Sequence, residues 1–322
     1  MDKVPLVEIR VRTRVSAAEL EQKVGKVITD KDLNVVLTGP TLVRKPDGSV
    51  LCIYLPNALD QTLVDGAYPV LHSIQDATDN RGLASGSERV RKVNSIDTSA
   101  RALRVKSSLI GSFDRAGGMF PYCRTTAWTG AHAAEFTGIF PLFEHIAEIF
   151  RTYLPDRYAA QAKQAAQTDR SWVIGDTPFT TVTVNNTYPT GVHQDVGDLD
   201  EGFSNLAVLR RGEYSGGILT FPEYRVGANM GDGDLILMDA HEWHGNTKMV
   251  LGSEDAERIS LVLYFRTRMV ACGTPAEEVA RAKRIRSPDF QFDAPKPSDT
   301  VTTAFDGRHD PTGGVEPYVK KG

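Results

Sequence analysis

Six short β-rich runs in the second half of the chain constrain its fold most strongly. From about residue 172 onwards, apolar and β-branched residues gather in short segments that turn residues separate. Such runs at regular spacing are typical of antiparallel sandwiches and barrels. The sequence therefore predicts a β barrel or sandwich over about 172–270. The runs are WVIG, FTTVTVNNT, SNLAVLRR, GILTF, DLILMD and RISLVLYFR.

Helices are predicted before this β-rich half. Between Pro141 and Leu154, apolar residues recur at a spacing that places them on one face of a helix, which predicts burial of that face. An Ala- and Gln-rich segment from Asp156 to Gln167 predicts a second helix. Nearer the N-terminus, Ser16 and Glu19 form the capping-box pattern that begins a short helix. We therefore expect an α+β protein in which helices come first and a β barrel follows.

Strand signals also occur near the N-terminus, so the chain does not divide simply into two halves. Residues 4–15 alternate apolar and charged side chains, which is typical of an edge strand. The turn at 46–48, Pro-Asp-Gly, lies between two apolar runs and predicts a hairpin. We expect one domain over residues 1–275, with an N-terminal elaboration over 1–125. A basic helix and a loosely ordered tail should follow over 276–322.

Charge and cysteine content limit the partners and the compartment. The 322 residues carry a net charge of −4 and no apolar run long enough to span a membrane. This balance gives no support to nucleic acid as a partner, but residues 81–106 hold seven basic residues against two acidic ones. That run is either a solvated loop or one that contacts phosphates. The three cysteines, Cys52, Cys123 and Cys272, argue against a disulfide framework and predict a reducing cytoplasm.

His193 and Asp195 form an H-x-D triplet directly after a β run. In an extended chain, residues two apart point to the same side, so this imidazole and this carboxylate can reach one ion. Two histidines and one carboxylate on one face of the metal are the ligands of iron(II) oxygenases. The third ligand should come from a distant strand, and DLILMDAHEWHGN offers His241 and His244. We favour His244, because Gly245 after it permits a tight turn, while His241 could orient a ligand or the substrate.

Spacing excludes the other metal and hydrolase motifs that we considered. His241 and His244 are three residues apart, so HEWH is not the HExxH motif of zinc proteases. A cupin would have H-x-H where this chain has H-x-D, and no GxSxG motif is present. Because an H-x-D triplet alone recurs by chance, its weight depends on the distal histidine and on the arginine that follows.

Arg258 is the candidate cation for a 2-oxo acid co-substrate. Such a co-substrate chelates iron with its keto-acid end, and its far carboxylate needs a fixed cation, ideally the fork of an arginine. Arg258 opens the run RISLVLYF, and Ser260, two positions on, points the same way and can donate a second hydrogen bond. The competing interpretation is a surface ion pair with an acidic neighbour within 254–257. Arg266, at the far end of the same strand, is the alternative cation.

The segment from His193 to Arg266 resembles the iron(II)/2-oxoglutarate-dependent oxygenases, and more narrowly their TET/JBP group. Members of that group hydroxylate the methyl group of a 5-methylpyrimidine in nucleic acid. Upstream, FPYCRTTAWT is similar to a segment of the phage and bacterial branch of the group. No cysteine-rich zinc region like that of the animal members is present. The likeness spans about 105–270 and is carried by GVHQDVGD, GFSNLAVLRRG, GGILTFPEY, GDLILMDAHEWHGN and ERISLVLYFR.

The resemblance implies a fold, a set of cofactors and several site residues. The implied fold is a double-stranded β-helix (jelly-roll) core with helices packed on one side, and the implied cofactors are Fe(II), 2-oxoglutarate and O2. The implied metal ligands are His193, Asp195 and His244. The residues implied for 2-oxoglutarate or substrate are Arg258, Ser260, Arg124, Asn186 and Asn205. For Arg124 a buried ion pair competes with this role, and for the two asparagines a structural role competes.

Two functions compete on this basis. The first is hydroxylation of 5-methylcytosine or thymine in DNA, with the target base flipped into the pocket. It would place the loop Arg81–Lys106 and the basic helix segment Arg281–Arg286 on the DNA backbone. The second is hydroxylation of a free small molecule such as a nucleoside, an amino acid or a natural product, which the acidic net charge favours. A non-catalytic binding protein is disfavoured by the intact ligand set.

Overall fold

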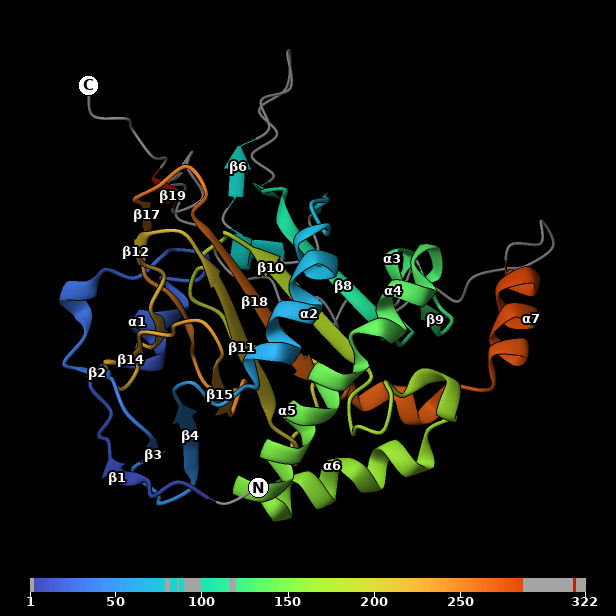
Figure 1. Ribbon diagram of the computed structural model, residues 1–322, viewed down its shortest axis with the longest axis horizontal. Coiled ribbons are helices and arrows are strands. Elements are labelled where there is room, and N and C mark those ends of the chain that lie inside the picture. Colours follow the sequence, from blue (N-terminus) through green and yellow to red (C-terminus); the bar gives the residue numbers. More distant parts are fainter. Residues whose placement is uncertain are drawn as a thin grey trace.

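A large mixed sheet forms the centre of the molecule (Figure 1). The computed structural model describes residues 3–78, 82–85, 87–89, 100–115, 120–285 and 315–316. In this part of the chain the sheet has the strand order β1-β3-β4-β15-β11-β18-β10-β8-β5, with β9 beside β8. Its strands are β1 (Val7–Arg10), β3 (Thr41–Arg44), β4 (Val50–Leu55), β5 (Ala77–Thr78), β8 (Val105–Phe113), β9 (Arg124–Thr125), β10 (Thr181–Asn186), β11 (Ser204–Arg211), β15 (Asp234–Met238) and β18 (Glu257–Tyr264).

A smaller sheet of order β16-β13-β14-β2 is the second sheet of the core. Two further small sheets, β12-β17-β19 and β6-β7, complete the described strands. The remaining strands are β2 (Val35–Leu37), β6 (Ser87–Arg89), β7 (Ala100–Ala102), β12 (Tyr214–Gly216), β13 (Leu219–Phe221), β14 (Val226–Ala228), β16 (Gly245–Asn246), β17 (Met249–Leu251) and β19 (Val315–Glu316).

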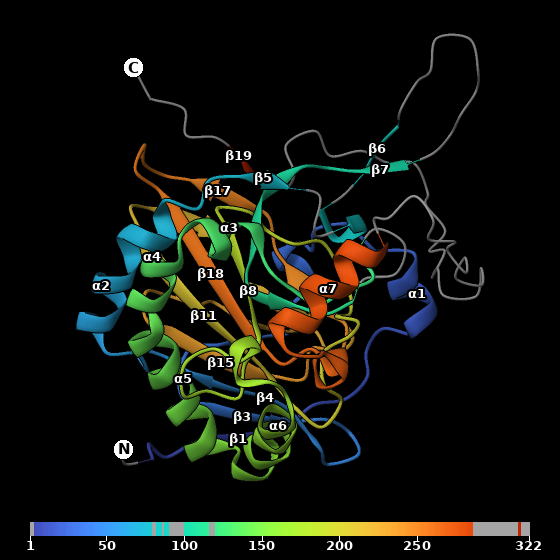
Figure 2. The same ribbon diagram turned by 90° about the vertical axis from the view of Figure 1, so that its right-hand side faces the viewer.

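Helices cover one face of the large sheet, as expected (Figure 2). Side chains of α2, α4 and α5 pack against that face, and α6 follows α5 after a single residue. The helices are α1 (Ala17–Glu21), α2 (Gln61–His72), α3 (Ala127–Ala131), α4 (Ala133–Gly138), α5 (Phe140–Tyr153), α6 (Pro155–Gln167) and α7 (Pro275–Ile285). Short 3₁₀ turns lie at Asp30–Asp32, Gly82–Ser85, Arg170–Trp172 and Thr267–Ala271.

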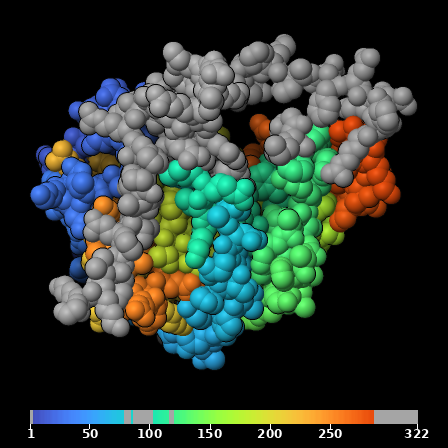
Figure 3. Space-filling model, turned by 90° about the horizontal axis from the view of Figure 1, so that it is seen from above, coloured from blue at the N-terminus to red at the C-terminus, as the bar shows by residue number. Residues whose placement is uncertain are grey.

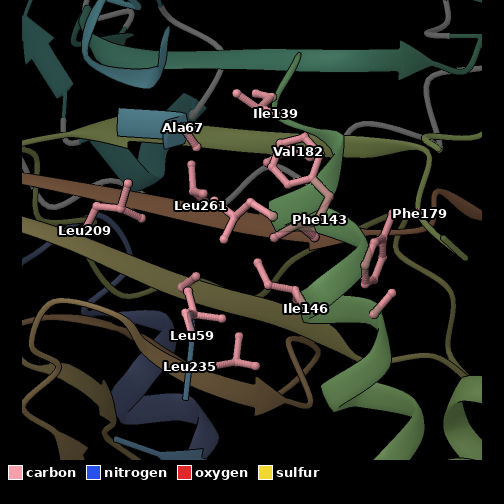
Figure 4. Close-up of a cluster of buried hydrophobic side chains, with 14 of the residues drawn as sticks. Leu59, Ala67, Ile139, Phe143, Ile146, Phe179, Val182, Leu209, Leu235 and Leu261 are labelled. Atoms are coloured by element: carbon pink, nitrogen blue, oxygen red, sulfur yellow. The ribbon is translucent and has the colours of Figure 1, made fainter. Parts of the chain in front are cut away.

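Alternation along β18 separates two hydrophobic cores. Leu261 points toward the helices and packs in one cluster with Phe143 and Ile146 of α5 (Figure 4). Val262 and Tyr264 point to the opposite face and pack between the large and the small sheet. Each fully buried side chain of this size stabilises the fold by about 1.5–3 kcal/mol relative to its exposed form. The space between the sheets is the interior of the double-stranded β-helix, and the site described below lies there.

Several local predictions are confirmed. Ser16 and Glu19 make both hydrogen bonds of the capping box at the start of α1. The turn at 46–48 joins the antiparallel pair β3 and β4, and Gly48 there has a φ of +92°, which favours glycine. The strand predicted at 4–15 is β1, at the edge of the large sheet. The helix α1 ends at Glu21, because the chain next pairs through Val24 with the segment that carries His193.

The prediction drawn from the cysteines is wrong for one pair. Cys123 and Cys272 form a disulfide across 149 residues, with a Cα–Cα distance of 5.8 Å, while Cys52 is a buried free thiol. The sequence gives no local signal for this disulfide, because only folding brings Cys123 before β9 close to Cys272 after the barrel. Among the described residues, every helix is too short or too polar to cross a membrane.

Candidate metal centre

Backbone pairing holds His193 and His244 side by side. The amide of each residue donates to the carbonyl of the other, at 2.9 Å in both directions. This close approach needs small neighbours. A Cβ on Gly245 would meet the Gly191 carbonyl carbon at 3.0 Å, and a Cβ on Gly191 would lie 2.4 Å from the carbonyl carbon of Gly25. Gly245 opens the strand β16, so the structure does not show the tight turn predicted after His244. The three glycines instead allow the backbones to approach each other closely.

The side chains of His193, Asp195 and His244 converge on one point. One ligand atom from each residue lies within 4.8 Å of the other two. The Nε2 atoms of His193 and His244 lie 3.5 Å and 3.7 Å from the two Asp195 carboxylate oxygens. Both histidines are buried, while the Asp195 side chain is 20% exposed. The group therefore presents one partly open side.

Second contacts fix which nitrogen of each histidine faces this point. Nδ1 of His193 lies 2.8 Å from the Gly191 carbonyl, and Nδ1 of His244 lies 2.9 Å from the Glu242 carbonyl. Because a carbonyl only accepts, each Nδ1 must carry the proton, and the lone pair lies on Nε2. Such hydrogen bonds are how proteins orient metal-binding imidazoles. Two imidazole nitrogens and one carboxylate are the donor set of non-haem iron(II) oxygenases, so the triad fits iron(II).

His241 lies apart from this group. Its Nδ1 is 3.2 Å from Asp239 Oδ1, and its Nε2 is 3.3 Å from Asp200 Oδ1. The hydrogen bond to Asp239 is the main cause that raises the pKa of His241 to about 9. A protonated imidazole has no lone pair for a metal, so the geometry favours His244 over His241 as a ligand.

Arg258 is buried inside the β-helix without an acidic partner. Only 3% of the residue is exposed, and its Nη2 atom has no hydrogen-bond partner. Burial lowers the pKa of Arg258. The predicted alternative, an ion pair with an acidic neighbour, is not formed in the described part of the chain. Glu257 lies on the other face of β18, where Asn186, Tyr68 and His72 bind it. A buried guanidinium without a carboxylate partner fits an anionic co-substrate.

Ser260 faces the interior together with a residue that the sequence analysis missed. Ser260 pairs in register with Asn185 of β10, and Asn185 Nδ2 donates to Ser260 Oγ at 3.4 Å. Ser107 Oγ on β8 donates to Asn185 Oδ1 at 2.7 Å. A polar ladder therefore crosses three neighbouring strands on the interior face.

The structure does not bring the two predicted asparagines to this face. Asn186 pairs in register with Ile259 and donates to Glu257 on the helix-covered side. Asn205 pairs with Leu263, which also faces the helices, and donates to the Phe203 carbonyl at 3.0 Å. Both side chains point away from the triad because side chains alternate along a strand. Their predicted contact with substrate or co-substrate is therefore corrected to a structural role.

Arg124 lies on β9 against two aromatic rings. Its guanidinium carbon is 4.0 Å from the ring centre of Phe120 and 5.0 Å from that of Phe113. Burial lowers the pKa of Arg124, and within the described residues it pairs with no carboxylate. The buried ion pair nearby belongs to Arg266, whose Nε is 2.9 Å from Asp114 Oδ1. Arg266, the alternative cation for the co-substrate, is therefore already engaged.

Two further buried carboxylates are Asp198, close to Asp195, and Glu278 on α7. Burial, followed by the charge of Asp195, raises the pKa of Asp198 to about 7. Glu278 near the start of α7 is 2% exposed and accepts hydrogen bonds from the Cys123 amide and from Arg115, at 2.9 Å and 2.8 Å. These bonds, with the disulfide, fix α7 beside β9. The outer turns of α7 and Arg115 line a hollow of about 540 Å³, with Arg281 and Arg284 among its walls.

A double-stranded β-helix that encloses two histidines, one carboxylate and a buried arginine defines the class of 2-oxoglutarate- and iron(II)-dependent oxygenases. A family model confirms this class. Residues 111–267, just under half of the chain, match Tet_JBP, described as the oxygenase domain of the 2OGFeDO superfamily. The chain therefore carries an oxygenase domain of the Tet/JBP group. Oxygenases of this superfamily use Fe(II), 2-oxoglutarate and O2, as the sequence analysis predicted.

Curated relatives and a solved structure agree with this assignment. Thymine dioxygenase JBP1 of Trypanosoma brucei brucei is 33% identical over 241 residues, which cover 74% of this chain and 26% of that protein. The JBP1 of Leishmania braziliensis is 30% identical over 246 residues, covering 76% and 28%. The structure of NgTET1 in complex with 5mC DNA matches with a TM-score of 0.53 at 15% identity, over 84% of this chain and 100% of that one. This last likeness establishes the fold. The chain spans about a quarter of the length of these curated relatives.

Proposed function

We propose that this chain hydroxylates the methyl group of a 5-methylpyrimidine, 5-methylcytosine or thymine, in DNA, using Fe(II), 2-oxoglutarate and O2. The observation that carries the proposal is the convergence of His193, Asp195 and His244 inside a Tet/JBP oxygenase domain. The identity of about a third with thymine dioxygenases supports DNA as the substrate. We infer that residues 1–275 act as one catalytic unit, since β1, β3 and β4 extend the same sheet as the core strands.

In this proposal His193, Asp195 and His244 hold the iron ion. Iron(II) with 2-oxoglutarate and O2 supplies the oxidising power needed for an unactivated C–H bond. The protein orients the two imidazoles through the Gly191 and Glu242 carbonyls and leaves the Asp195 side partly open. Arg258, with Ser260, binds the far carboxylate of 2-oxoglutarate, because it is a buried donor whose charge no carboxylate of the described chain balances.

The DNA backbone is assigned to basic groups of α7, to Arg124 and to the loop Arg81–Lys106. Arg281 and Arg284 lie on α7, which protrudes at the edge of the molecule opposite the N-terminal segment (Figure 3). Arg124 is proposed to contact the co-substrate or a substrate phosphate. In the loop Arg81–Lys106, most basic side chains lie outside the described residues, as does Arg286 at the end of the basic helix. These contacts stay predictions. The resemblance to the phage and bacterial branch of the TET/JBP group also stays a prediction.

The compartment also stays a prediction. A cytoplasmic location was predicted from the sparse cysteines, and the Cys123–Cys272 disulfide is the feature that disfavours a reducing compartment.

The experiment is mass spectrometry of nucleosides after reaction with Fe(II), 2-oxoglutarate and O2. Duplex DNA containing 5-methylcytosine or thymine is compared with the free nucleosides and a panel of amino acids. We expect hydroxymethyl product from DNA only, its loss in His193→Ala, and its retention in His132→Ala, which changes an exposed histidine on the helical side. Product from free nucleosides or amino acids, with none from DNA, would instead establish the small-molecule function.

A further inference from the structure

The segment 239–244 orients two of the three residues that converge at the metal centre. The Ala240 carbonyl accepts a hydrogen bond from the Asp195 amide at 3.0 Å. The Glu242 carbonyl lies 2.9 Å from Nδ1 of His244 and fixes the direction of that ring. Contacts of this kind decide where a ligand atom points. The geometry of the centre therefore depends on the conformation of this one segment.

A lysine from the N-terminal part of the chain binds this segment at two points. Lys45 Nζ lies 3.0 Å from Asp239 Oδ2 and 2.8 Å from Glu242 Oε1. The exposed fractions of the three side chains are 15%, 16% and 20% in that order, and ion pairs shielded from water to this degree are screened little by salt. Burial would lower the pKa of Lys45, but its hydrogen bonds to the two carboxylates raise it, so the positive charge is kept.

The β3–β4 hairpin holds Lys45 in place. Lys45 directly follows β3, and its amide donates to the Ser49 carbonyl at 2.8 Å. On β4, which pairs with β15, the Leu51 carbonyl accepts from the Asp239 amide at 3.0 Å. The hairpin therefore contacts the segment both through its backbone and through the lysine. It lies outside the residues 111–267 that match the family model.

Lys45 also balances negative charge behind the metal centre. Glu242 accepts a second hydrogen bond, from the Tyr224 hydroxyl at 2.8 Å. Burial and then the charge of Glu242 raise the pKa of the neighbouring Glu223, whereas the charge of Lys45 lowers it. Loss of the lysine would remove the attraction that holds Glu242 and leave its repulsion with Glu223. Both changes loosen the segment 239–244.

We propose that Lys45 is a positioning residue of the metal centre, which holds the segment 239–244 in the conformation that brings the three ligands together. The inference rests on the proposed function, because that function assigns those ligands to an iron ion. Lys45 acts through the backbone carbonyls of Ala240 and Glu242. The N-terminal hairpin is thus a working part of the oxygenase domain, in addition to extending its sheet.

Anaerobic calorimetric titration of Mn(II) into the metal-free full chain tests this role. Lys45→Met keeps the length of the side chain and removes its charge, and we expect it to weaken Mn(II) binding about tenfold or more. The absorption spectrum of bound Co(II), which reports ligand geometry, should change in the same variant. Lys163→Met is the matched control, because Lys163 is exposed on α6 and should leave both measurements unchanged.

A double variant separates positioning from folding. In Lys45→Met/Glu242→Gln the unpaired charge at position 242 is gone, and Asp239 keeps its contact with His241 at 3.2 Å. Urea unfolding should therefore return toward the wild-type midpoint. The segment still lacks its lysine, so the affinity for Mn(II) should stay about tenfold below that of the wild type, with the Co(II) spectrum still altered.

The outcomes separate this inference from the proposed function. If the wild type binds Mn(II) and Lys45→Met binds it equally well, the positioning role is wrong while the proposed function stands. Affinity that returns together with stability in the double variant would show a merely structural role and would also overturn the inference. A wild-type chain that binds no Mn(II) would refute the proposed function and the inference together.

Discussion

Replacement of Gly191 by alanine should destabilise the fold around the metal centre. A Cβ at this position would lie 2.4 Å, 2.6 Å and 2.7 Å from the carbonyl carbon, oxygen and Cα of Gly25. All three are backbone atoms, so no side-chain rotation relieves the overlap, and the two segments must separate. Overpacking of this kind costs about 1–3 kcal/mol. The same shift moves the Gly191 carbonyl, which orients His193, so the affinity for metal should fall by about 10- to 100-fold.

Urea unfolding and Mn(II) titration measure the two effects. Gly66→Ala is the matched control, because Gly66 lies inside α2 and a Cβ there meets nothing within 4 Å. That substitution should stabilise the chain by about 0.5–1 kcal/mol through helix propensity, without changing the metal affinity. A Gly191→Ala variant with wild-type stability and wild-type affinity would refute the argument that backbone contact at Gly25 positions His193.

Three further predictions concern the disulfide, pH and salt. Reduction of Cys123–Cys272 should lower the free energy of unfolding by up to about 5 kcal/mol, because the bond closes a loop of 149 residues, and a reductant should have no such effect on the Cys123→Ala/Cys272→Ala variant. His241 has its pKa raised from 6.5 to about 9, so its contribution to stability is complete below about pH 6.5 and is lost as the pH rises through 9. Thermal unfolding should show this decline in the wild type and not in His241→Asn; equal pH profiles would contradict it. Arg284→Gln should reduce the slope of log affinity for DNA against log salt by about 1, whereas Arg170→Gln, which removes an arginine paired with Asp176, should leave it unchanged.

Much of the fold could be predicted because the relevant signals are local. The helix at 141–154, the capping box at Ser16 and five of the six short β-rich runs each depend on a few neighbouring residues, and all of these are present in the structure. The sixth run, WVIG at 172–175, is not a strand, because Trp172 ends the 3₁₀ turn Arg170–Trp172. The spacing of the H-x-D triplet, the distal histidine and the R-x-S pair predicted an iron(II) oxygenase domain. The family match confirms this class of domain.

The errors at the site have two physical causes. The sequence analysis names Asn186 and does not consider Asn185. Val182 and Val184 alternate in step with Asn186 and belong to the core under the helices, and this alternation is the signal that places Asn185 inside. The Cys123–Cys272 pair could not be predicted, since no local pattern reports that residues 149 positions apart will meet.

The surroundings of Arg258 also needed the structure. Tyr214 lies on a separate small strand, and only the register of β11 with β18 places Arg210 opposite Arg258. A sequence shows each of these residues as an ordinary polar or aromatic position, and the buried Arg258 Nη2 without a hydrogen-bond partner becomes visible only when burial is known.

Anaerobic titration of Fe(II) into the wild type, His244→Ala and His241→Ala tests the metal centre most directly. We predict one bound ion per wild-type chain, loss of that binding in His244→Ala, and its retention in His241→Ala, because only His193, Asp195 and His244 converge within 4.8 Å. Retained binding in His244→Ala together with loss in His241→Ala would contradict the assignment of the ligands on which the proposed function depends.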